Sequence, residues 1–222
     1  MSCVLVIAPH PDDETLGCGG TLLRHLTEGD TVHWLIVTSM HEAQGFSQEA
    51  IERRHGQIEQ VHQAIGFSGR HELELPTTRL DTLPLGDIVA AIGGVVKTVN
   101  PDTLYLPYGG DVHSDHGVVL AATKSCSKWF RYPGVRRIYS YETLSETDFA
   151  LPPTGPGMPI NRYVDISAYL EKKLDILTLY EDELDNFPFP RSIEAVTALA
   201  KLRGVAAGCN AAEGFQILKE II

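Results

Sequence analysis

The sequence lacks the cysteine spacing of a cysteine-bound metal or redox site. Its four cysteines, Cys3, Cys18, Cys126 and Cys209, form no C-x-x-C pair, and each is predicted to be a small buried hydrophobic residue. No segment approaches the ~18 uninterrupted apolar residues of a membrane span. The N-terminus has no basic stretch followed by a long apolar run, which argues against a signal peptide. We therefore expect a cytoplasmic protein without a membrane span.

Positive charge is also scarce. Lys and Arg number 18 against 29 Asp and Glu, a net charge of −11. A polyanion would meet net repulsion, so we expect no nucleic-acid partner, although a local basic pocket for a phosphate is compatible with this charge. With 43% hydrophobic and 21% charged residues, the composition is that of a globular protein and excludes disorder. A chain of 222 residues is expected to form one domain.

Short apolar runs alternate with amphipathic stretches through the first two thirds of the chain. The alternation predicts βαβ units in a mostly parallel sheet with helices on both faces. Ser47 is predicted to begin one helix as its N-cap, and Gly66 to end it. The predicted strands are Val4–Ala8, Thr31–Thr38, His71–Leu75, Thr103–Leu106 and Val135–Glu142, and the predicted helices are Glu14–Glu28, Ser47–Ile65, Leu85–Val99 and His116–Lys128.

The last third of the chain is expected to be a helical extension. A stretch rich in proline and glycine, residues 151–159, leads to it. A long helix is predicted from about Ser167, followed by two more helical stretches that end at Ile222. The fold class is thus α/β: a single Rossmann-like domain over residues 1–222, with a core of about 1–150 and a C-terminal helical part of about 160–222.

Gly17–Gly20 has the appearance of a dinucleotide-binding loop but not its spacing. A G-x-G-x-x-G motif would need glycine at position 22, where Leu22 stands. We expect these glycines to allow close packing of a helix, and we expect no nucleotide cofactor.

Two loops that follow predicted strands carry histidines and carboxylates. Residues 9–14 (PHPDDE) follow the first strand, and residues 107–116 (PYGGDVHSDH) follow the fourth. In open α/β sheets, ligands bind beyond the carboxyl ends of the strands. Either loop alone is typical of a solvated polar turn, but together they supply two histidines and a carboxylate, the ligand set of many hydrolytic zinc sites.

These two loops also carry a family resemblance. The APHPDDE stretch at Ala8–Glu14 and HSDH at His113–His116 resemble the PIG-L/LmbE-like family of zinc-dependent N-acetylglucosamine deacetylases. The resemblance covers essentially the whole chain. Further matching segments are RLDTLP at 79–84, SYETLSETDF at 140–149, YVDIS at 163–167, FPRS at 189–192 and AAEGF at 211–215.

The resemblance implies a role for each residue of the two motifs. It implies that His10, Asp13 and His116 bind one zinc ion, that Asp12 is the general base, and that His113 polarises the carbonyl and stabilises the oxyanion. A carboxylate beside the metal can take a proton from water without occupying a coordination position. Another divalent metal could replace zinc in the cell.

A protonated imidazole at position 113 would suit the negative charge that develops on the amide oxygen. Asp115 or Asp111 could hydrogen-bond one ring nitrogen and keep the imidazole charged. Asp115 is the preferred candidate.

Four further residues are candidates for substrate contacts, each with a simpler alternative. Arg54 lies on the apolar face of its helix, where a buried salt bridge is the simpler alternative, and the resemblance implies instead that it reaches the substrate. The resemblance likewise implies that Asp81 contacts sugar hydroxyls, with a turn residue as the alternative, and Glu142 either faces the site or caps a helix. Arg191 is a candidate anion contact or a surface residue at a helix start.

The expected function is zinc-dependent hydrolysis of the N-acetyl group of an N-acetylated amino sugar or sugar conjugate. The alternative is a zinc amidase with a different acyl group or scaffold. A non-catalytic sugar- or metal-binding protein would be expected to have lost Asp12 or His113, and both are present. The resemblance also implies a homo-oligomer.

Overall fold

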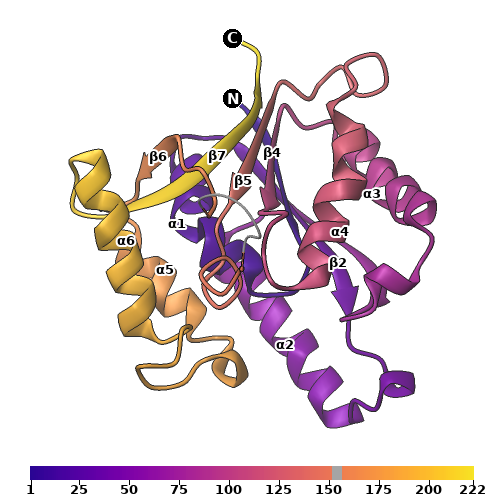
Figure 1. The fold of residues 1–222 in the computed structure, drawn as a ribbon, viewed down its shortest axis with the longest axis horizontal. Helices are drawn as coiled ribbons and strands as arrows, with labels where there is room; N and C mark the ends of the chain where they lie inside the picture. The colour runs from indigo at the N-terminus through magenta and orange to yellow at the C-terminus, as the bar shows by residue number, and fades with distance from the viewer. Residues whose placement is uncertain (152–156) are drawn as a thin grey trace.

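A seven-stranded sheet forms the centre of the computed structural model, which describes residues 1–151 and 157–222 (Figure 1). The strand order is β3-β2-β1-β4-β5-β7-β6. The first five strands are parallel, and β7 runs antiparallel to its neighbours β5 and β6. The strands are β1 Cys3–Ala8, β2 Thr31–Ser39, β3 Gly69–Pro76, β4 Thr103–Pro107, β5 Arg137–Tyr141, β6 Arg162–Asp165 and β7 Ala212–Glu220. The predicted α/β fold with a mostly parallel sheet is confirmed.

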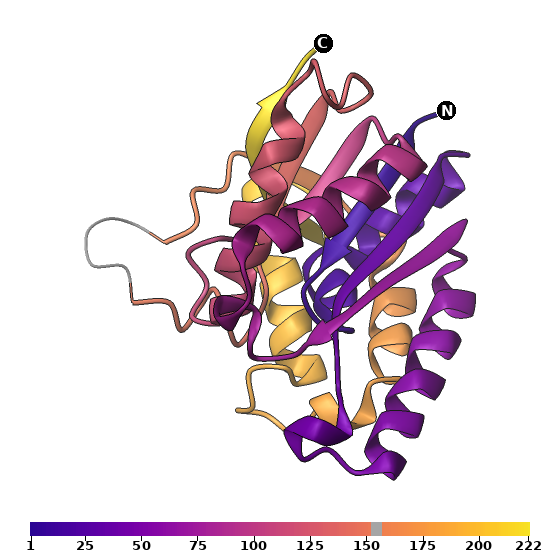
Figure 2. The same cartoon turned by 90° about the vertical axis from the view of Figure 1, so that its right-hand side faces the viewer.

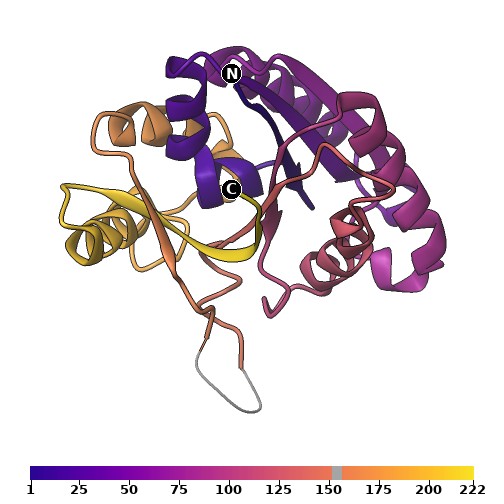
Figure 3. The same cartoon turned by 90° about the horizontal axis from the view of Figure 1, so that it is seen from above.

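Helices cover both faces of the sheet (Figure 3). Along β1, Val4 and Val6 pack with α1, α2, α5 and α6, whereas Leu5 and Ile7 pack with α3 and α4. This alternation explains why β1 is apolar at every position: both of its faces are buried. The helices are α1 Asp13–Thr27, α2 Gln48–Ile65, α3 Leu85–Val99, α4 Ser114–Thr123, α5 Leu170–Leu177 and α6 Ile193–Ala207. Among the described residues, none of the helices is both long and apolar enough to cross a membrane.

The predicted ends of α2 are confirmed. The Ser47 side chain accepts a hydrogen bond from the backbone N–H of Ala50, which satisfies one of the free donors at the helix start. Gly66 ends the helix with φ of 90°, a left-handed conformation that glycine adopts without a steric penalty.

The end of the chain differs from the prediction. Residues 212–220, expected to be helical, form β7, and the helix predicted from about Ser167 is the shorter α5. Phe215 is buried against Tyr105, and Ile217 packs on the same apolar cluster. Tertiary packing of this stretch between β5 and β6 therefore overrides its local pattern. The predicted connecting loop includes residues 152–156, which lie outside the described residues.

The glycines of α1 allow close packing, as predicted. A Cβ atom at Gly17 would lie 2.2 Å from the Tyr141 ring, and one at Gly20 would lie 2.8 Å from Ile166. The helix is kinked between these two glycines, at Cys18.

A buried ion pair binds the backbone of α1 on both sides of this kink. The Lys173 ammonium lies 2.6 Å from the Glu213 carboxylate, and both side chains are 4% exposed. Lys173 also donates to the carbonyl of Leu16, and Glu213 accepts the backbone N–H groups of Gly20 and Thr21. The pair thus satisfies the backbone groups that the kink leaves free on both sides.

We expect Glu213→Ala to lower the free energy of unfolding by about 3–5 kcal/mol, because it leaves the Lys173 ammonium buried without its carboxylate. Urea denaturation followed by circular dichroism would measure the change. The matched control is Arg24→Ala, which breaks an exposed ion pair with Glu28 and should cost less than about 1 kcal/mol. Equal effects of the two substitutions would contradict the prediction.

Candidate metal centre and active-site cavity

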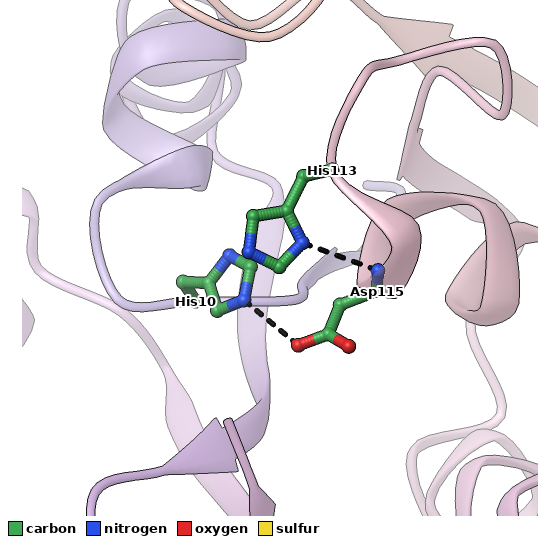
Figure 4. A group of neighbouring side chains, drawn as sticks. All are labelled: His10, His113 and Asp115. Atoms are coloured by element: carbon green, nitrogen blue, oxygen red, sulfur yellow. Dashed lines mark hydrogen bonds and ion pairs between the residues drawn. The ribbon is translucent and has the colours of Figure 1, made fainter. Parts of the chain in front are cut away.

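The two predicted loops meet at the carboxyl ends of neighbouring strands. β1 pairs with β4, so the loop before α1 and the loop before α4 lie side by side. The first loop brings His10, Asp12 and Asp13, and the second brings His113 and His116. Figure 4 shows His10 and His113 facing each other from the two loops, with ring centroids 4.4 Å apart.

His10, Asp13 and His116 offer ligand atoms that all lie within 4.8 Å of one another. His10 Nδ1 and His116 Nε2 are each 3.3 Å from Asp13 Oδ2. Ligands at 2.0–2.1 Å from a tetrahedral zinc ion are separated by about 3.4 Å. His116 Nε2 is buried and has no hydrogen-bond partner within the described chain. The three side chains therefore fit a metal ion.

Two outer carboxylates orient the histidines. His10 Nε2 lies 3.1 Å from Asp115 Oδ2, and His116 Nδ1 lies 2.7 Å from Asp111 Oδ2. A proton on each of these nitrogens leaves His10 Nδ1 and His116 Nε2 as the free lone pairs that point to Asp13. Hydrogen bonds of this kind fix the tautomer of metal-binding histidines and strengthen them as ligands.

The carboxylate of Asp115 therefore differs from its predicted role at His113. It accepts hydrogen bonds from His10 and from the backbone N–H groups of Thr78 and Leu80. Only the backbone N–H of Asp115 reaches His113, at 3.2 Å from Nδ1. The helical turn that begins at Ser114 directs the carboxylate away from the His113 ring, so the residue that Asp115 orients is His10.

A second group, His10, His113 and Asp115, also has ligand atoms within 4.8 Å of one another (Figure 4). This group suits a metal less well. The Asp115 carboxylate already accepts three N–H groups, and His113 Nδ1 already accepts the backbone N–H of Asp115. In the first group, by contrast, His116 Nε2 is free of any such bond.

The charges of this centre attract a cation. Burial lowers the pKa of His10, but hydrogen bonds with Asp115 and Asp13 outweigh it and raise the pKa to about 9. Burial also lowers the pKa of His116, but the charges and hydrogen bonds of Asp13 and Asp111 outweigh burial and raise this pKa to about 10. Despite burial, His116 and His10 hold the pKa of Asp13 well below its usual range. A cation bound here would take the place of the protons on His10 Nδ1 and His116 Nε2.

We expect Asp111→Ala to weaken metal binding about 10–100-fold, because His116 loses the carboxylate that fixes its tautomer. Competition with a chromogenic chelator would measure the affinity. Asp81→Ala, at an exposed position outside the cavity, is the control and should leave the affinity unchanged. Wild-type affinity in Asp111→Ala would contradict the assignment of the outer carboxylate.

Asp12 is buried beside this centre in a strained conformation. Its φ of 127° is rare for any residue but glycine. Hydrogen bonds hold the backbone here: the Asp12 N–H donates to Glu14, and Arg54 donates to the carbonyl of the preceding Pro11. Burial, then the charges of Asp13 and Glu183, raise the pKa of Asp12 well above its usual range. A raised pKa suits a carboxylate that accepts a proton near neutral pH.

The surroundings of His113 oppose the protonated imidazole that the sequence predicts there. Burial and the neighbouring His10 lower its pKa to about 4. Its Nδ1 accepts the N–H of Asp115, so the ring proton resides on Nε2. A neutral ring in this tautomer can donate a hydrogen bond through Nε2.

A cavity of about 260 Å³ opens over these residues. His10, Asp12, Asp13 and His113 line it, and so do Arg54 and Arg191. The structure combines the two alternatives for Arg54, because this arginine lines the cavity and also forms an ion pair with Glu183. Arg191 binds the same carboxylate, with its Nη2 at 3.1 Å, and its Nη1 lies 3.9 Å from Asp12.

Sequence reasoning missed Glu183. The residue belongs to the acidic stretch 181–185, which is typical of a solvated loop. The one available signal is the inward position of Arg54, which requires a partner.

The structure does not bring Asp81 and Glu142 to this cavity. Asp81 is exposed in a single 3₁₀ turn, Leu80–Thr82. Glu142 forms a two-point ion pair with Arg203 of α6, at 2.8 and 2.6 Å, and does not line the cavity. We therefore leave both residues out of the proposed substrate contacts.

The parallel sheet and the histidine–aspartate centre at its carboxyl edge define an α/β protein with a candidate hydrolytic metal site. The family described as PIG-L, GlcNAc-PI de-N-acetylase, matches residues 5–127. This match covers more than half of the chain, and the chain belongs to that family. The predicted family is thus confirmed, and with it the prediction of a hydrolytic enzyme.

Individual relatives are similar over most of their length. A 1D-myo-inositol 2-acetamido-2-deoxy-alpha-D-glucopyranoside deacetylase from Saccharomonospora viridis is 25% identical, over 82% of this chain and 85% of that protein. The structure of N,N'-diacetylchitobiose deacetylase from Pyrococcus horikoshii has a TM-score of 0.77 at 20% identity, over 97% of this chain and 83% of that one.

The same fold also occurs in a protein of different chemistry. GalB, the 4-carboxy-2-hydroxymuconate hydratase from Pseudomonas putida KT2440, has a TM-score of 0.75 at 16% identity, over 100% of this chain and 98% of that one. At this identity the likeness concerns the fold alone, so the function has to be argued from the site.

Proposed function

We propose that this protein is a zinc-dependent hydrolase that removes the N-acetyl group from an N-acetylated amino sugar or sugar conjugate. The observation that carries the proposal is the free, buried Nε2 of His116, 3.3 Å from Asp13 and oriented by Asp111. Asp12 and His113 line the cavity at this centre. The family match and the deacetylases among the relatives support the same reaction.

His10, Asp13 and His116 would hold the ion. When bound, a zinc ion polarises a carbonyl and lowers the pKa of water towards ~7. Asp12 is the general base: its carboxylate accepts the proton of the attacking water and later delivers a proton to the departing amine. The contacts of Glu14 and Arg54 hold the strained backbone at Asp12 in place.

His113 stabilises the developing oxyanion as a neutral donor. With Nδ1 held by the Asp115 N–H, its Nε2–H is the proton offered to the amide oxygen. A preformed donor of this kind acts without reorganisation during the reaction. The products are acetate and a free amine.

Arg54 and Arg191 are the proposed polar contacts for the substrate. Both line the cavity, and Glu183 fixes both guanidinium groups. Donors held in this way suit sugar hydroxyls or a phosphate.

The proposal is tested by acetate release from free, nucleotide-linked and lipid-linked N-acetylhexosamines, with and without a chelator. We expect release from at least one member of the panel and its loss on chelation. Amine formation without acetate would favour the alternative, a zinc amidase with another acyl group. Release that persists after the chelator has removed all metal would contradict metal dependence.

Three further expectations remain predictions: a cytoplasmic location, a homo-oligomeric state and the organisation of residues 1–222 as one domain.

A further inference from the structure

One wall of the cavity is apolar. Met40, Phe46 and Ile51 line it, and each is partly exposed. None of the three belongs to either apolar cluster on the two faces of the sheet, whereas their neighbour Ile58 belongs to one and also lines the cavity. Apolar side chains that face a ligand cavity instead of the core are available for contact with a ligand.

All of these residues come from one stretch of the chain. Met40 and Phe46 lie in the connection between β2 and α2, and Ile51 and Ile58 lie on α2. Figure 2 shows this connection at the same end of the molecule as the segment between α5 and α6, which supplies Glu183 and Arg191 to the cavity. The β2–α2 stretch thus lines the cavity with these apolar side chains and with Arg54 and His55, and the α5–α6 segment supplies Glu183 and Arg191.

Two cationic side chains of the cavity already have a carboxylate partner. Arg54 and Arg191 are both engaged by Glu183. A sugar hydroxyl placed against the side chains of Met40, Phe46 and Ile51 would lose hydrogen bonds with water that these side chains cannot replace, which is unfavourable. An alkyl or aryl group in the same place would remove apolar surface from water on both sides.

We propose that this wall binds an apolar substituent of the substrate, an alkyl or aryl group carried by the N-acylated amino sugar. The inference rests on the proposed function and narrows its substrate class. An apolar group can reach the wall either as the aglycone of the sugar or as an acyl chain longer than acetyl.

Binding can be measured without turnover in the zinc-loaded Asp12→Asn protein. Isothermal titration would compare methyl, butyl and hexyl glycosides of N-acetylglucosamine in one arm. The other arm compares N-acetyl, N-butyryl and N-hexanoyl forms of the methyl glycoside. We expect the dissociation constant to fall at least tenfold from the shortest to the longest member in one arm, since each buried methylene contributes up to about a fourfold gain. The arm that responds identifies the source of the apolar group.

Substitutions test whether the apolar wall causes the dependence of affinity on chain length. In the same background, Phe46→Ala and Ile51→Ala should reduce the dependence on chain length to less than threefold. The control is Phe130→Ala, an exposed aromatic residue outside the cavity, which should preserve the full dependence. A dependence that survives in Phe46→Ala and Ile51→Ala would overturn the assignment of the wall.

The failures of the two proposals are distinguishable. Affinity that does not change with chain length in either arm, or no binding of any member, overturns the apolar wall, even if the wild-type enzyme releases acetate. Affinity that rises with chain length supports the wall, even if no acetate or other acid is released and the proposed hydrolysis is wrong.

Discussion

Asp12→Asn is expected to lower kcat for acetate release about 10²–10⁴-fold while the protein keeps its zinc. The amide of asparagine has nearly the shape of the carboxylate but cannot accept the proton of the attacking water. Asp12 is separate from the three side chains whose ligand atoms converge, so its charge is not needed to hold the ion. Initial rates and metal analysis on the same protein sample would measure both quantities.

Asp81→Asn is the matched control for this substitution, because Asp81 is an aspartate outside the cavity. It should retain wild-type kcat. Unchanged turnover in Asp12→Asn would remove Asp12 as the base. Loss of zinc from Asp12→Asn would instead mean that Asp12, and not only Asp13, is a ligand.

His116→Ala is expected to abolish stable zinc binding and to abolish turnover with it. The substitution removes one of three ligands and also the group that Asp111 orients. We expect the zinc affinity to fall by more than the factor of about 10–100 that is typical for loss of an outer hydrogen bond. Zinc per chain after dialysis against a weak chelator would measure the loss, and circular dichroism would verify that the variant is folded.

His25→Ala is the control for this experiment. His25, Glu28 and Asp30 form another group with ligand atoms within 4.8 Å, away from the cavity. The variant should keep one zinc per chain and wild-type turnover. Loss of zinc from His25→Ala together with its retention in His116→Ala would show that the metal binds at His25, Glu28 and Asp30 and would contradict the proposed site.

The sequence predicted most of what determines the position of the candidate centre. The apolar run of β1 and the shorter run of β4 are each followed at once by histidine and aspartate. Parallel strands place such loops at one edge of the sheet. Only the adjacency of β1 and β4 had to come from the structure.

The outer contacts could not be predicted in the same way. Whether Asp115 reaches His10 or His113 depends on where α4 begins, and this start directs the carboxylate to His10. The lowered pKa of His113 depends on burial and on the charge of His10 from the other loop. Neither quantity is local to the sequence motif.

Long-range packing also explains the other differences. Glu142 sits at the end of β5 as predicted, but Arg203 of α6 binds it, and α6 itself contacts the distant strand β7. The pattern of residues 212–220 did not distinguish a strand from a helix, since its pairing partners β5 and β6 are distant in sequence. Contacts between distant segments decided both cases.

The most direct test of the metal centre is anomalous diffraction at the zinc absorption edge from crystals of the zinc-loaded protein. We predict one strong peak at bonding distance from His10 Nδ1, Asp13 and His116 Nε2. Asp12 and His113 should lie close to this peak but beyond bonding distance. A peak bonded to His10, His113 and Asp115, or no peak in the cavity at full zinc loading, would contradict the account.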